Sequence, residues 1–110
     1  MIRRICAHDV IAATADVVGV RRESIWEGSR DRMVAFARHV TVWLLIDIGY
    51  TRAFAADVVG LRENSAGHSV RLIDAWLTNG SKQSRELRAH IARIRALAAM
   101  PEPERKMEAA

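Results

Sequence analysis

Three polar residues with helical spacing offer the clearest chemistry in the chain. Asn64, His68 and Arg71 stand at i, i+4 and i+7, so on a helix they project to the same side. Arginine forms forked hydrogen bonds with guanine, and asparagine does so with adenine. The spacing therefore predicts a face that can read base edges in DNA. A solvated helix face has the same pattern, and periodicity alone favours that plainer interpretation.

Residues at the start of the same segment extend this polar face. Arg62, Glu63 and Ser65 lie next to Asn64, and a glutamate can accept a hydrogen bond from cytosine. Asn64 and Ser65 are also candidate N-terminal caps. The other side of the segment is apolar at i, i+4, i+7 and i+11, with Ala66, Val70, Ile73 and Leu77. We therefore expect an amphipathic helix over Glu63–Leu77.

A shorter helix is predicted directly before it, over Arg52–Val59, with Gly60 between the two. A helix-turn-helix requires a small residue in the first helix and a residue that tolerates positive φ in the turn. Ala56 stands four positions before Gly60, and apolar packing residues flank the turn at Val59 and Leu61. The segment Thr51–Leu77 therefore predicts a helix-turn-helix.

A basic loop precedes the longest predicted helix and carries Arg30 and Arg32. Arg38 and His39 follow within the next turns of that helix. An arginine on a loop beside a helix-turn-helix is a candidate for contact with phosphate or the minor groove. An ordinary surface loop is the alternative, because much of the charge is neutralised by two acidic neighbours, Glu27 and Asp31.

The remaining elements predict an all-α, compact six-helix bundle around this helix-turn-helix. Further helices are expected over Ala7–Val18, over Glu23–Trp26, over Asp31–Ile48, and from Ser81 or Ser84 to Ala99. The third is apolar around much of its circumference, as expected of a central helix. The last carries four arginines on its polar side, at Arg85, Arg88, Arg93 and Arg95. Residues 1–100 are expected to form one domain, and residues 101–110 a charged, disordered tail.

Composition favours a globular protein of a reducing compartment. Of the 110 residues, 50% are hydrophobic, and the 17 Lys and Arg residues against 13 Asp and Glu give a mild net charge of +4. That charge permits a polyanionic partner without requiring one. The single cysteine, Cys6, cannot form an internal disulfide, so we expect a cytoplasmic protein, associated with the bacterial nucleoid if it binds DNA.

Several other function classes are not expected. No segment has the ~20 apolar residues that span a bilayer. The four histidines are too dispersed for a metal site, so no metal or other cofactor is expected. The acidic, serine and histidine residues show no spacing typical of a nucleophile and its base, so we do not expect an enzyme.

Two stretches resemble the C-terminal DNA-binding domain (domain IV) of the bacterial replication initiator DnaA. Val17–Leu45 resembles the family's short helix, basic loop and entry into a long helix. Val59-Gly60-Leu61-Arg62-Glu63-Asn64-Ser65 resembles its Phe-Gly-Gly-Arg-Asp-His-Thr signature. The two matches align without a gap and span roughly residues 5–98. The resemblance implies a six-helix, Trp-repressor-like fold with a recognition helix in the major groove of duplex DNA.

The resemblance also implies roles for individual residues. Arg30 matches the minor-groove arginine, and Arg38 and His39 match a pair that contacts the DNA backbone. The family residues that read bases are matched by Glu63, Asn64 and Ser65. The chain departs from the family pattern at Gly28, Asp31, Ile46, Ala66 and Gly67, so the preferred DNA sequence is not carried over. No counterpart of the family's ATPase module is present, so replication initiation is not implied.

The leading hypothesis is a stand-alone, sequence-selective DNA-binding protein that regulates transcription or replication. Its partners would be double-stranded DNA and a replication or regulatory protein, and the sequence leaves the oligomeric state open between a monomer and a homodimer. The alternative is a protein-interaction module that kept the fold and lost DNA binding. The mild charge and the weakened basic loop favour this alternative.

Overall fold

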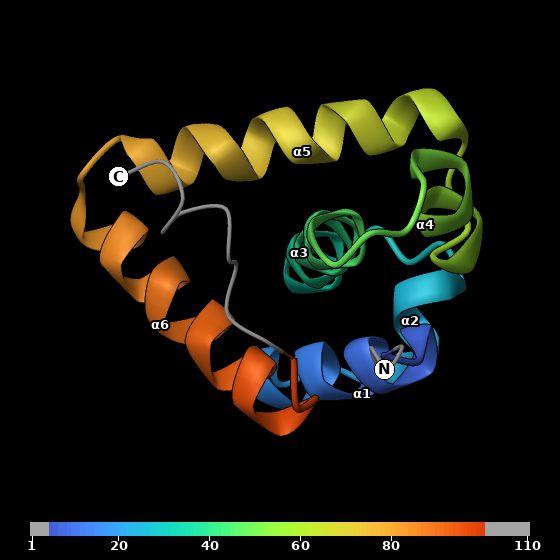
Figure 1. Cartoon of the computed structure of the whole chain (residues 1–110), viewed down its shortest axis with the longest axis horizontal. Coiled ribbons are helices and arrows are strands. Elements are labelled where there is room, and N and C mark those ends of the chain that lie inside the picture. Colours follow the sequence, from blue (N-terminus) through green and yellow to red (C-terminus); the bar gives the residue numbers. More distant parts are fainter. Residues whose placement is uncertain (1–4, 101–110) are drawn as a thin grey trace.

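A computed structural model describes residues 5–100, which form six α-helices joined by short turns (Figure 1). The bounds are α1 (Ala7–Val18), α2 (Arg22–Trp26), α3 (Arg32–Asp47), α4 (Arg52–Val58), α5 (Glu63–Thr78) and α6 (Lys82–Leu97). No strand occurs in the described range. The predicted all-α class is therefore confirmed, and the helix ends lie within one or two residues of the predicted positions.

Helix α3 occupies the centre of the fold, as its apolar circumference predicted. Figure 1 shows it end-on, with α5 on one side and α1 and α6 on the others, and it packs against α1, α2, α4 and α5. Six residues of α3 have no exposure at all, and these are Ala37, Val40, Thr41, Val42, Leu44 and Leu45. Each neighbouring helix buries its own apolar stripe against this surface.

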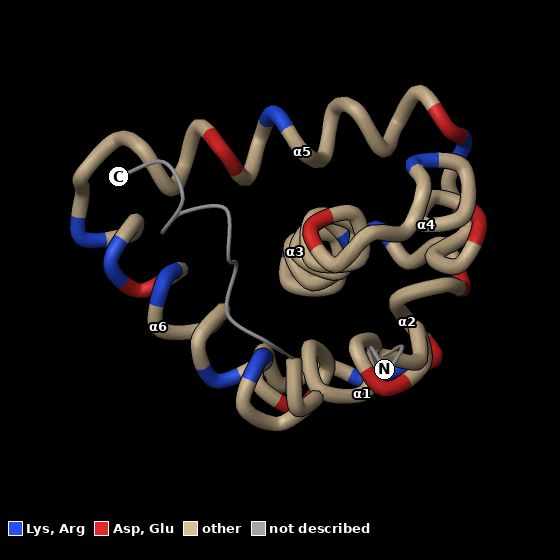
Figure 2. The backbone as a smooth tube through the Cα atoms, viewed as in Figure 1, with Lys and Arg blue, Asp and Glu red and all other residues tan. Residues whose placement is uncertain are grey.

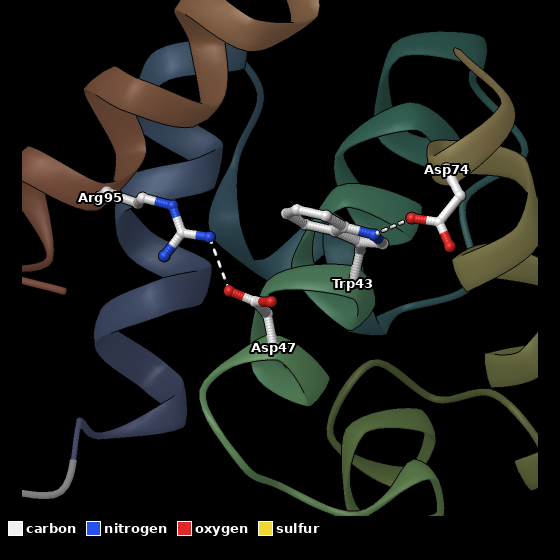
Figure 3. A network of polar contacts seen from close by, with 4 residues as sticks. All are labelled: Trp43, Asp47, Asp74 and Arg95. Carbon is white, nitrogen blue, oxygen red and sulfur yellow. Dashed lines mark hydrogen bonds and ion pairs between the residues drawn. The ribbon is translucent and has the colours of Figure 1, made fainter. Parts of the chain in front are cut away.

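Figure 3 shows two of the polar links between α3 and its neighbours. The indole Nε1 of Trp43 donates to Asp74 on α5 at 2.9 Å. One turn later, Asp47 accepts from Arg95 on α6 at 2.7 Å, and the two side chains of this pair are only 7% and 8% exposed. The prediction that Arg95 lies on the polar side of the last helix is wrong, because Asp47 provides a buried charge partner that offsets the desolvation of the guanidinium.

Side-chain caps begin three of the helices. Asp31 accepts from the backbone amides of Met33 and Val34, Thr51 from that of Phe54, and Ser81 from that of Ser84. Helix α5 has no such cap: its N-cap residue is Arg62, whose side chain makes no capping bond. The prediction of Asn64 or Ser65 as caps is wrong, because both already lie within the first helical turn.

Two further sequence expectations concern the limits of the described chain. The tail over residues 101–110, expected to be disordered, lies outside the described residues. Among the helices within residues 5–100, none is long and apolar enough to cross a membrane.

Candidate nucleic-acid interface

The turn between α4 and α5 is fixed by its backbone. Gly60 has φ +77°, and the amide of Leu61 donates to the carbonyl of Ala56 at 2.8 Å, which closes the end of α4. The turn also lies directly on the end of α2, since a Cβ on Gly60 would be 2.9 Å from the carbonyl oxygen of Trp26. Glycine is therefore required here both for its conformation and for its lack of a side chain.

Helix α5 separates its apolar and polar residues as predicted. Ala66 and Ile73 are fully buried, and Val70 and Leu77 pack against the same core. The outward side carries exposed polar residues from the first turn to the third, and these are Arg62, Glu63, Asn64, His68 and Arg71. Ser65 is half-buried between the two sides. The structure thus places six predicted site residues in one continuous region, formed by α5 and its N-cap residue.

Arg38 lies inside the protein instead of on its surface. It is 8% exposed, and its guanidinium donates to three backbone carbonyls, those of Ile25 (2.8 Å), Ser29 (3.1 Å) and Ser24 (3.3 Å). Burial lowers the pKa of the guanidinium, which stays protonated because arginine starts so high. This placement does not favour the direct contact with the DNA backbone expected of Arg38. The guanidinium instead ties α2 and the loop after it to α3.

His39, the next residue, ties α3 to α5. Its ring Nδ1 lies 2.7 Å from the hydroxyl of Ser69, and its ring meets that of His68 edge-on with centroids 5.8 Å apart. Burial, the nearby His68 and the adjacent Arg38 all lower the pKa of His39. Arg38 and His39 therefore hold the loop and α5, the two segments predicted to meet DNA, against the central helix.

The loop between α2 and α3 presents Arg30 in an exposed position. Its path is set on one side by the bond from Arg38 to the Ser29 carbonyl and on the other by Asp31, whose carboxylate caps α3. The carboxylate of Asp31 thus accepts hydrogen bonds from two backbone amides and stabilises the start of α3. Arg30 extends from a loop that is anchored at both ends.

One basic residue of this region was missed by the sequence reasoning. Arg52, the first residue of α4, lines a pocket of about 590 Å³ together with Arg71 and Gly67 of α5. Glu63 and Asn64 complete the lining. Figure 2 shows basic positions where α4 and α5 meet, and others along α6. The sequence offered only a weak signal for Arg52, an arginine at the start of the first helix of the predicted motif.

An apolar groove lies elsewhere on the surface, between α3, α5 and α6. It has a volume of about 640 Å³ and is lined mainly by Met33, Phe36, Leu72, Trp76 and Leu87. Arg32, one of the predicted DNA-binding residues, lines this groove and not the pocket of Arg52 and Arg71. Arg32 is exposed in this position.

Comparison with known proteins adds no constraint to this geometry. No protein-family model, no curated protein and no solved structure matches the chain.

Proposed function

We propose that this chain binds double-stranded DNA selectively, with α4 and α5 as a helix-turn-helix of the Trp-repressor and DnaA type. The observation that carries the proposal is the surface of α5. Asn64, His68 and Arg71 lie exposed on one side, while Ala66 and Ile73 fix the other side in the core. A recognition helix needs this division, because base edges are read by side chains on a rigid, outward face.

The anchored loop supports the proposal as a second contact. Arg30 is exposed, and its loop follows directly on the end of α2 against which the α4–α5 turn packs. A guanidinium in this position is suited to a phosphate or to a narrow minor groove. Regulation of transcription or replication, in the bacterial cytoplasm and at the nucleoid, is the role that such binding would serve.

Fluorescence anisotropy with labelled duplexes tests the proposal. Duplexes selected from a random pool should bind the chain, and the affinity should fall steeply with salt. Asn64→Ala should cost about 1–3 kcal/mol at selected sites and little elsewhere, whereas Arg30→Ala should weaken binding to all sequences. Arg93→Ala, an exposed arginine on α6, is the matched control. Absence of binding to any duplex at about 50 mM salt would refute the proposal, since non-specific affinity is strongest at low salt.

A protein-interaction module is the second candidate function. The groove between α3, α5 and α6 favours it, because its lining is mostly apolar and Met33 there is 46% exposed. The two candidate functions can be distinguished by which substitution weakens binding. Met33→Gln should leave duplex affinity unchanged if α5 binds DNA, and Asn64→Ala should leave a protein complex unchanged if the groove is the working surface.

A further inference from the structure

Two arginines from different helices extend over the same glycine. A Cβ on Gly67 would lie 3.4 Å from Nη1 of Arg71 and 3.9 Å from Nη1 of Arg52. Arg71 belongs to α5, as Gly67 does, whereas Arg52 begins α4, so the fold brings the two guanidiniums together. Gly67 is buried beneath them, and any larger residue would occupy the space above its Cα.

The two guanidiniums carry like charges. Within residues 5–100, neither has a carboxylate oxygen within the 4.0 Å of an ion pair. Two cations near one position repel each other, and an anion between them relieves that repulsion. Guanidinium groups bind phosphate through paired, charge-assisted hydrogen bonds, so phosphate is the anion that suits this geometry.

Glu63 indicates which phosphate this would be. Its carboxylate lines the same pocket and opposes an anion there, which reduces the affinity for a free phosphate ion. A phosphate within a duplex is positioned by the other contacts of the protein, so it does not depend on this pocket alone. The pocket also includes Asn64, a residue of the proposed reading surface, which places it beside the path of the duplex.

We infer that Arg52 and Arg71 together hold one phosphate of the DNA backbone, above Gly67. The inference rests on the proposed function and deepens it. It adds Arg52 to the contact residues, moves Arg71 from base reading to backbone contact, and explains the glycine within α5. A glycine inside a helix is destabilising by about 1 kcal/mol relative to alanine, and a side chain at this position would take up space next to the two guanidiniums.

Duplex-binding measurements on four variants test the inference. Arg52→Ala and Arg71→Ala should each weaken binding about tenfold on every sequence, the loss expected for one charge-assisted contact. In the double variant, the slope of log affinity against log salt should become less steep by about 1, since one phosphate contact is lost. Gly67→Leu should cause a similar loss with no change in charge. Leucine is a good helix former, and a far-UV circular dichroism spectrum equal to that of the unaltered chain checks that the variant is folded. Arg85→Ala and Arg93→Ala, both exposed on α6, should bind as the unaltered chain does.

A duplex in which single phosphates are replaced by neutral methylphosphonates gives the decisive comparison. At one phosphate position, the methylphosphonate should weaken binding of the unaltered chain and have no effect on binding of the Arg52→Ala, Arg71→Ala double variant. Equal affinities for Arg52→Ala, Arg71→Ala and Arg93→Ala would overturn the inference and leave the proposed function standing. So would a loss from Arg71→Ala at selected sequences only, which would assign Arg71 to a base. If the unaltered chain binds no duplex, the proposed function fails and the inference fails with it.

Discussion

Alanine at Gly60 should destabilise the protein more than alanine at Gly19. The two glycines have similar backbone conformations, with φ of +77° and +89°. Their surroundings differ: nothing lies within 4 Å of a Cβ on Gly19, whereas a Cβ on Gly60 would be 2.9 Å from the carbonyl oxygen of Trp26. Gly19 therefore reports backbone strain alone, and Gly60 reports strain together with a clash against backbone.

The magnitudes follow from these two terms. A left-handed conformation costs an L-residue about 1–2 kcal/mol, and this applies at both positions. The clash at Gly60 forces the turn away from α2, and such overpacking typically costs about 1–3 kcal/mol more. We expect a loss in unfolding free energy of about 1–2 kcal/mol for Gly19→Ala and about 2–5 kcal/mol for Gly60→Ala. Alanine also reduces the entropy of the unfolded chain, and this gain is the same for both variants.

Urea denaturation followed by far-UV circular dichroism measures both variants. Tryptophan fluorescence is a second probe, because Trp26 lies at the contact in question. Coincident transitions would support a two-state comparison. Equal losses for the two variants would contradict the prediction, since they would mean that the contact between the α4–α5 turn and α2 imposes no steric constraint.

Three further predictions concern the side chains that hold the helices together. Arg95→Met should lower the unfolding free energy by about 3–5 kcal/mol, because it breaks an ion pair whose two side chains are both buried, and a loss below about 1 kcal/mol in urea denaturation would contradict this. Arg38→Lys should destabilise by about 2–3 kcal/mol in the same assay, because a single ammonium cannot reach three carbonyls; unchanged stability would argue against the anchoring role. The pKa of His39 is lowered from 6.5 in the folded chain, so the folded chain binds fewer protons than the unfolded chain as the pH falls. The contribution of His39 to the unfolding free energy is therefore complete above about pH 6.5 and is lost as the pH falls towards the lowered pKa. His39→Gln should therefore flatten the fall in unfolding free energy between about pH 7 and 5, and an unchanged slope would exclude this assignment.

Helix positions could be predicted from the sequence because they depend on local properties. Apolar residues at i, i+4 and i+7 define a face, and glycines such as Gly19 and Gly60 end helices because they adopt positive φ. The division of α5 into a core side and an outward side is the same kind of information. The predicted caps on α5 were wrong because Asn and Ser are also tolerated within a first turn, and local preference does not decide between these positions.

What each polar residue contacts depended on tertiary structure. Arg38 and Arg95 look like surface arginines in a helical pattern, yet the fold covers one with the carbonyls of α2 and its loop and gives the other a buried carboxylate. Arg52 and Arg71 are far apart in sequence, and only the packing of α4 on α5 places them over Gly67. The helices and their apolar faces could be predicted from the sequence alone, since they depend on neighbours along the chain. The tertiary structure decided which charges are buried, which are anchors and which are exposed, because burial and electrostatic partners are set by residues that are distant in sequence.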